Sequence, residues 1–261
     1  MDLKLDGKNA VVCGSTQGIG KASAIELALL GADITLISRD EKKLKSVAKD
    51  LPTPLGQKHD YLVADFNFPD LLQSGLEKHF SKEPVHILVN NTGGPAPGNA
   101  FDAKSDEYVK AFTNHLLCSQ VLVQALVPGM KKQGYGRIIN IVSTSVKQPI
   151  RGMGVSNTIR GAVASWAKTL SVELALFGIT VNNVLPGTAL TARLEALMRN
   201  RAKKAGKTVE DIKKDMIAEI PAGRIAEASE IAAAVAFLAS PAAAYINGIN
   251  LPVDGGRTGS L

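Results

Sequence analysis

The amino-acid sequence predicts an α/β fold in which a doubly wound, seven-stranded parallel sheet carries helices on both faces. The first observation is that apolar runs of strand length alternate with helix-length segments along the 261 residues. The second is that the strand runs are continuously apolar instead of alternating, which requires cover on both faces of the sheet. The third is that no linker, repeat or low-complexity tract interrupts the order, so residues 1–261 are expected to form a single domain.

Short turns separate the expected elements. Residues 9–13 form the first strand, residues 18–30 form a helix that stops at Gly31, and the run DITLIS at 33–38 forms the second strand, before a charged helix at 40–50. The remaining strands are expected at 61–64, 85–89, 137–142, 180–185 and 249–253. The helices that cover them are expected near 106–132, 154–176 and 229–238. Right-handed crossovers then build the parallel sheet.

Composition excludes several classes of protein. The chain is 45% hydrophobic and has no apolar run long enough to cross a membrane, and its first residues lack the apolar core of a signal peptide. Cys13 and Cys118 form no metal-spaced pair, and four scattered His give no ligand cluster. The net charge is +6, but aromatic residues make up only 5%, which does not fit a nucleic-acid surface. We expect a cytoplasmic, metal-free protein that binds neither nucleic acid nor membrane.

Residues 188–222 are longer than a turn and helix-prone, and they follow the sixth strand on the side of the sheet where ligands bind. The first part of them, residues 191–207, holds six basic residues and one acid, Glu195. The basic residues are Arg193, Arg199, Arg201, Lys203, Lys204 and Lys207. One interpretation is a substrate lid whose basic face meets an anionic substrate. The other is a solvated helix face.

A glycine-rich turn predicts a dinucleotide site. Gly14, Gly18 and Gly20 follow the first strand and open the first helix. The absence of side chains lets the backbone approach a pyrophosphate, and the helix N-terminus presents free N–H groups to it.

The end of the second strand predicts which dinucleotide binds. An acid there would accept hydrogen bonds from the ribose and repel a 2′-phosphate, whereas an Arg would bind that phosphate. The strand ends in Ser38 and Arg39, which favours NADP(H) over NAD(H). Asp40 follows as the one acid at this place, and it also fits the N-cap of the next helix.

Further motifs extend from Leu5-Asp6-Gly7-Lys8 to Val253-Asp254-Gly255-Gly256. They include Asn90-Asn91-Thr92-Gly93, Pro186-Gly187-Thr188 and Tyr245-Ile246-Asn247-Gly248. With the glycine turn, they make the chain similar to the short-chain dehydrogenase/reductase family, whose fold is Rossmann-like, and particularly to its 3-oxoacyl-[acyl-carrier-protein] reductases. The resemblance and the strand ends together assign the cofactor to Gly14, Ser15, Thr16, Gln17, Gly18, Ile19, Gly20, Ser38, Arg39, Asp65, Phe66, Asn91, Gly93, Arg160, Pro186, Gly187, Thr188 and Thr191.

The catalytic positions depart from the family pattern. The family reduces carbonyls with a Tyr as proton donor, a Lys that tunes it and holds the ribose, a Ser that binds the carbonyl oxygen, and an Asn that anchors a water relay. Ser143 matches the Ser, but Ser156 stands at the Tyr position and Arg160 at the Lys position. An aliphatic hydroxyl is a far weaker acid than a phenol, and an Arg does not deprotonate. The family's proton route is therefore not expected here.

The Asn position is ambiguous from the sequence. Counting back from Ser143 without a gap gives His115, and a one-residue irregularity in the helix would restore Asn114. Because His titrates near pH 6.5, one hypothesis is that His115 supplies the proton directly or through Ser156, while Arg160 orients the cofactor. The alternative is a His packed in the helix layer or at a subunit contact.

Three functions remain open, in this order. The first is an NADP(H)-dependent oxidoreductase (EC 1.1.1.-) that acts on a carbonyl, alcohol or activated double bond with a rearranged proton donor. The second is a catalytically degenerate relative that binds NADP(H) as a sensor or structural subunit, and the third is a non-redox enzyme using the same cleft. A homotetramer is expected from the resemblance and from apolar residues on several faces of the helices near 106–132 and 154–176, including Val163, Trp166 and Leu170.

Overall fold

The computed structural model describes residues 1–80 and 84–260, and this part of the chain forms one sheet of seven parallel strands. The strand order is β3-β2-β1-β4-β5-β6-β7, so the direction of winding reverses between β1 and β4. The strands are β1 (Asn9–Cys13), β2 (Asp33–Ser38), β3 (Asp60–Val63), β4 (Ile87–Asn90), β5 (Gly136–Ile141), β6 (Ile179–Pro186) and β7 (Asn250–Val253). The predicted doubly wound parallel sheet is confirmed.

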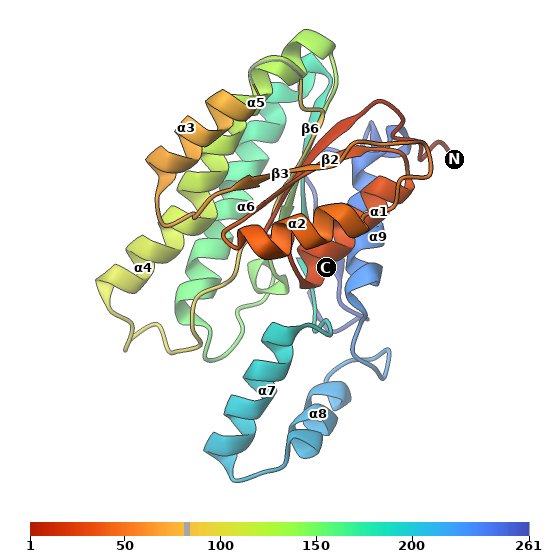
Figure 1. Cartoon of the computed structure of the whole chain (residues 1–261). Coiled ribbons are helices and arrows are strands. Elements are labelled where there is room, and N and C mark those ends of the chain that lie inside the picture. The colour runs from red at the N-terminus through yellow and green to blue at the C-terminus, as the bar shows by residue number, and fades with distance from the viewer. Residues whose placement is uncertain (81–83, 261) are drawn as a thin grey trace.

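Helices cover both faces of the sheet (Figure 1). One face carries α1 (Gly18–Leu29), α2 (Glu41–Asp50) and α9 (Ala228–Ala239). The other carries α3 (Pro69–His79), α5 (Cys118–Gln133) and α6 (Gly154–Leu174). The sequence analysis did not anticipate α3, which begins with Pro69 in its first turn, a position where the missing N–H of a proline costs the helix nothing.

Neighbouring residues of β1 explain why the strand runs are continuously apolar. Val12 packs in one core with Leu27 of α1 and Val235 of α9. Val11 points to the opposite face and packs in a second core with Leu72 of α3 and Leu122 of α5. Because successive side chains alternate between faces, both must be apolar when helices cover both sides.

A row of asparagine side chains crosses the four strands β4, β5, β6 and β7. Asn90 of β4 donates to Asn140 of β5 over 2.9 Å, and Asn140 donates to Asn183 of β6 over 2.9 Å. Asn183 in turn donates to Asn250 of β7 over 2.8 Å. These residues are direct partners in the strand pairing, so the amide row runs parallel to the backbone hydrogen bonds.

The segment expected as one helix at 106–132 is interrupted. It consists of α4 (Ser105–Phe112), a π-helical turn at Thr113–Leu117, and α5. A π turn accommodates one extra residue within a helix, which shifts the faces of α4 and α5 relative to each other. This is the one-residue irregularity that the ambiguous asparagine position required.

Two helices project from the carboxyl edge of the sheet, α7 (Ala192–Ala205) and α8 (Val209–Ala218) (Figure 1). They turn at Gly206, whose φ of 64° is left-handed and suits glycine. A small apolar core of their own joins them; its buried members are Leu194, Met198, Ala202, Ile212 and Met216.

Candidate active site

A cavity of about 670 Å³ opens beside the carboxyl ends of the strands, at the point where the strand order reverses. This is the place where doubly wound sheets bind their ligands. The predicted site residues that line it are Gly14, Thr16, Gln17, Gly18, Ile19, Ser38, Arg39, Asp65, Phe66, Asn91, Gly93, Ser143, Ser156, Arg160, Pro186, Gly187, Thr188 and Thr191. Ser15 and Gly20 are buried in the turn instead.

The glycine turn is packed too tightly for side chains. A Cβ on Gly14 would lie 2.7 Å from the Asn91 backbone oxygen, and a Cβ on Gly20 would lie 2.3 Å from the Gly14 oxygen. Asn91 Nδ2 donates to the carbonyls of Cys13 and Gly14 over 3.2 and 3.3 Å, which fixes the turn to the end of β4. Gly93, by contrast, faces open space at the cavity wall. The turn is a rigid backbone cradle with room beside it.

At the end of β2, the cavity wall is formed by Ser38 and Arg39. The Ser38 hydroxyl lies 3.4 Å from the Thr16 hydroxyl of the glycine turn. Asp40 is not part of the wall: its Oδ1 accepts the backbone N–H of Lys43 over 3.1 Å as the N-cap of α2, and this bond lowers the pKa of its carboxyl group. A hydroxyl and an exposed guanidinium at this place fit a ribose that carries a 2′-phosphate.

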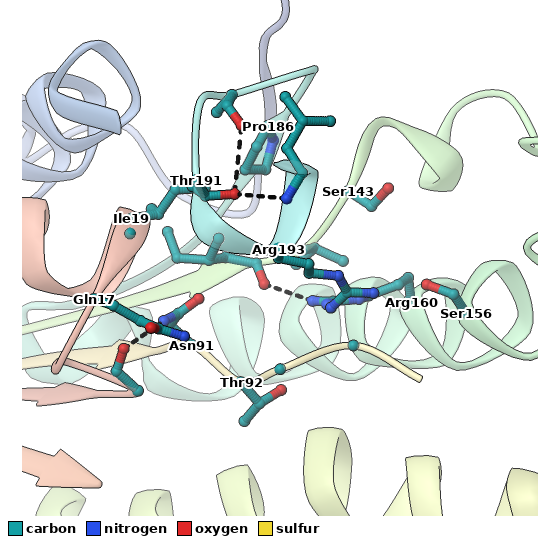
Figure 2. A pocket seen from close by; sticks show the side chains of 18 of the residues that line it. Gln17, Ile19, Asn91, Thr92, Ser143, Ser156, Arg160, Pro186, Thr191 and Arg193 are labelled. Carbon is teal, nitrogen blue, oxygen red and sulfur yellow. Dashed lines mark hydrogen bonds between the residues drawn. The ribbon is translucent and has the colours of Figure 1, made fainter. Parts of the chain in front are cut away.

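Ser143, Ser156 and Arg160 meet at the other end of the cavity (Figure 2). Ser143 follows β5, and its Oγ accepts the N–H of Ser145 over 3.1 Å. Ser156 and Arg160 are four residues apart on α6, so they share one face of that helix. Both side chains are largely buried, and both line the cavity.

Arg160 is a buried cation without a carboxylate partner among residues 1–80 and 84–260. Its Nη1 donates to the Ile141 carbonyl over 2.7 Å, and its Nε has no hydrogen-bond partner in the described part of the chain. Burial first, and then the nearby charge of Arg193, lowers the pKa of the guanidinium to about 10. Burying an unpaired charge is costly unless a ligand completes its hydrogen bonds, so this group is suited to holding a polar ligand.

The π turn decides the asparagine position. Asn114 lines the large cavity, donates to Asn67 over 3.3 Å, and has a buried Oδ1 with no partner among the described residues. His115 does not line it; His115 Nδ1 hydrogen-bonds Thr92 Oγ1, and the ring borders a separate cavity of about 10 Å³. Burial, followed by the charges of Arg160 and Arg193, lowers the pKa of His115 to about 2. Proton donation by His115 stays a hypothesis, and its absence from the wall of the large cavity does not favour it.

The structure also brings in residues that sequence reasoning did not assign to the site. Arg193 was counted only among the basic residues of 188–222, and Arg257 was not considered; both line the cavity. Ile150, Met153, Leu197 and Met216 add apolar wall. No local pattern marks these positions, because they come together from α7, α8, the start of α6 and the C-terminal segment.

Two expected absences concern the described residues alone. Within 1–80 and 84–260, no group of three or more His, Cys, Asp or Glu side chains could hold a metal ion. The helices of the same residues include none that is both long and apolar enough to cross a bilayer. Cytoplasmic location stays a prediction.

Comparisons with known proteins agree with this geometry. A family model described as enoyl-(acyl carrier protein) reductase matches residues 14–258. The 3-oxoacyl-[acyl-carrier-protein] reductase of Haemophilus influenzae is 35% identical, over 97% of this chain and 98% of its own length. A solved structure described as a short-chain dehydrogenase/reductase family protein is 31% identical, covers 98% of this chain and 99% of its own, and superposes with a TM-score of 0.82.

The chain belongs to the short-chain dehydrogenase/reductase family. Another solved member, L-sorbose reductase of Gluconobacter frateurii in complex with NADPH and L-sorbose, is 30% identical, covers all of both chains and has a TM-score of 0.93. The family membership predicted from the sequence motifs is thereby confirmed. As in any short-chain dehydrogenase/reductase, the fold alone does not name the substrate, which depends on the site.

Proposed function

We propose that the protein is an NADP(H)-dependent oxidoreductase that interconverts a carbonyl and an alcohol (EC 1.1.1.-), or reduces an activated double bond. One observation carries the proposal: a single cavity runs from the glycine turn and the end of β2 to Ser143, Ser156 and Arg160. The cofactor supplies hydride when it is bound. The solved relative that holds NADPH supports the choice of NADP(H), as do Ser38 and Arg39 at the end of β2.

Each residue around the expected position of the nicotinamide has a role in this proposal. Arg160 donates to the nicotinamide ribose and places a fixed positive charge one helical turn from Ser156. Ser143 and Ser156 donate hydrogen bonds to the substrate oxygen, on which negative charge develops. The alcohol formed and a serine hydroxyl have similar acidity, so Ser156 passes on a proton that it regains from cavity water. Asn114, with its unpartnered Oδ1, is placed to hold such a water.

The rest of the assignment follows from the same elements. Residues 188–222, which include α7 and α8, act as the lid, and Arg193 and Arg201 of α7, which line the cavity, favour an anionic small-molecule substrate. Four chains associate as a homotetramer through α4, α5 and α6.

The main alternative is a relative that binds NADP(H) without turnover, as a sensor or structural subunit. The observation that favours it is the aliphatic hydroxyl of Ser156 at the position of a phenol, with Arg160 in place of a lysine. The two functions make different predictions for the same experiment.

The experiment is NADPH oxidation across a panel of ketones, 2-oxo acids and enones, with the natural protein beside the double variant Ser156→Tyr, Arg160→Lys. We expect the natural protein to turn over and the double variant to be no faster. Ser156→Ala should lower kcat/KM about 100-fold, since one group that handles a proton is removed. The matched control, His115→Asn, should keep the rate within about threefold, because His115 is outside the cavity.

Turnover by the double variant alone would overturn the proposal and make the nucleotide-binding function the better one. Loss of all turnover in His115→Asn, with NADPH binding intact, would instead identify His115 as the proton donor.

A further inference from the structure

The wall of the cavity is strongly basic. Besides Arg39 and Lys110, four arginines from α6, α7 and the C-terminal segment line it: Arg160, Arg193, Arg201 and Arg257. Among the described lining residues the only acid is Asp65, which lies after β3 at the adenosine end. Little negative charge on the wall offsets these cations, and one of them, Arg160, lies one turn of α6 from Ser156.

Among the described residues, Arg257 is the one of these four arginines that pairs with a carboxylate. Arg257 pairs with Glu219 and also donates to Thr188 over 3.4 Å. Within residues 1–80 and 84–260, Arg160 and Arg193 have no carboxylate within 4 Å. Each has instead a single carbonyl partner, which for Arg193 is Pro95 over 3.2 Å. Two unpaired guanidiniums that repel each other favour an anion between them.

Arg193 reaches its place across the cleft. It lies on α7, 98 residues from Pro95, and its guanidinium rests on Gly94, where a Cβ would lie 2.4 Å from Nη1. A side chain at Gly94 would therefore displace it. Arg193 is exposed and lines the cavity, so a ligand bound there can cover its side chain. In Figure 2 its guanidinium lies beside Arg160, with Ser156 and Ser143 bordering the same space.

We propose that Arg193 binds the carboxylate of a small carbonyl acid and sets the specificity of the site. The inference rests on the proposed function and names its substrate class. A planar guanidinium fork matches a carboxylate with two parallel hydrogen bonds, and Arg160 adds a second positive charge. The apolar wall of Ile150, Met153 and Leu197 suits the uncharged body of such an acid.

The position of Arg193 also limits the distance between the two reacting groups. The carbonyl must reach Ser143 and Ser156 while the carboxylate reaches Arg193 beside Arg160, so few bonds separate them. In the reduction, the carbonyl carbon gains hydride from NADPH and the oxygen gains a proton from water. The products are a hydroxy acid and the oxidised cofactor.

The competing source of an anion is the diphosphate of the cofactor itself. The test therefore separates substrate from cofactor. Arg193→Met and Arg193→Lys are compared with the natural protein on 4-methyl-2-oxopentanoate, on 4-oxopentanoate and on the methyl ester of each, and the Kd of NADPH is measured by its fluorescence. Arg199→Met is the matched control, since Arg199 lies on the same helix, pairs with Glu195 and does not line the cavity.

In Arg193→Met we expect KM for the preferred acid to rise about 30-fold or more, with the ester and the Kd of NADPH changed less than about threefold. In Arg193→Lys, KM for the acid should lie between those of the natural protein and Arg193→Met, because lysine keeps the charge but not the planar guanidinium. A natural enzyme that prefers the esters would overturn the proposal. So would a variant in which the Kd of NADPH rises and the acid-to-ester preference is unchanged, which would assign Arg193 to the diphosphate.

Binding gives a second readout that needs no turnover, which keeps failure of the proposed function distinct. The protein–NADPH complex is titrated with 4-methylpentanoate and with 4-methylpentanamide, and NADPH fluorescence reports occupancy. Tighter binding of the carboxylate, lost in Arg193→Met and kept in Arg199→Met, supports the anion site even if no substrate is reduced. Equal binding of acid and amide overturns it.

Discussion

Burial has different consequences for two basic side chains: Arg160, which lines the cavity, and His115, which does not. It lowers the pKa of His115 to about 2, so the imidazole is neutral at every physiological pH. It lowers the pKa of Arg160 only to about 10, so the guanidinium remains charged. The fixed charge in the cavity is therefore that of the arginine, and no histidine switch sits beside it. This contrast favours electrostatic stabilisation over proton donation by a side chain cation.

The pKa of His115 predicts an acid sensitivity of folding. The folded-state pKa lies below the unfolded value of about 6.5, so only the unfolded chain takes up this proton as the pH falls below that value. The free energy of unfolding should therefore drop by about 2 kcal/mol from this group between pH 7.5 and pH 5. Urea unfolding at the two pH values measures it.

The control for this prediction is the same pair of measurements on His115→Gln. The variant can be less stable at both pH values, but its loss between pH 7.5 and pH 5 should be smaller by about 2 kcal/mol. The comparison removes the contribution of His86, whose pKa burial also lowers. An equal pH dependence in both proteins would show that His115 is protonated in the fold.

Most of the residues that the sequence assigned to the cofactor line the cavity, because the patterns that mark them are local. The glycine turn, Ser38 and the N-cap role of Asp40 each depend on residues a few positions apart. The place of Arg193 could not be predicted, because it is set by packing against Gly94, 99 positions earlier in the chain. His115 and Asn114 could not be separated by counting, since a π turn leaves no reliable mark in the sequence.

At the scale of elements, the α7–α8 pair is held together by its own small core more than by the sheet. Its outward projection in Figure 1 fits a unit that opens independently of the main body. Met198→Ala should loosen that core by about 2 kcal/mol or more. Cleavage by trypsin within 199–207 should then be about 30-fold faster, and the main unfolding transition should shift little.

Asn200→Ala is the matched control for the lid, since Asn200 is exposed on the same helix. It should leave the cleavage rate unchanged, and NADPH with a bound acid should slow cleavage in the natural protein. A main transition that falls together with the lid in Met198→Ala would mean that α7 and α8 unfold only with the whole chain.

At the scale of the whole molecule, the residues cited for association need correction. Val163 and Leu170 are buried in the chain's own core, and Trp166 donates to Gln120 over 2.9 Å. The apolar residues left uncovered on this side are others: Val109, Phe112, Leu117, Val172, Leu176 and Phe177. They lie on α4, the π turn, α6 and the short turn after it, so the proposed homotetramer rests on these.

Val172 is 71% exposed on α6, and its replacement tests the assembly. Val172→Glu would bury a charge in each interface, so the mass in light scattering should fall from four chains to two or one. Leu55→Glu is the control, because Leu55 is an exposed leucine outside α4 and α6. A natural protein that already runs as one chain would contradict the homotetramer.

The asparagine row across β4, β5, β6 and β7 has a consequence for how the sheet finds its alignment. Strands that are apolar on both faces discriminate poorly against slippage, because a shift by one residue still buries Val and Ile on each side. A slip of β6 that puts Val184 opposite Asn140 would turn Asn183 away from Asn140 and Asn250 and leave buried amides unpaired, at about 1–3 kcal/mol each. The row therefore raises the free energy of this misaligned sheet, which the hydrophobic core alone would tolerate.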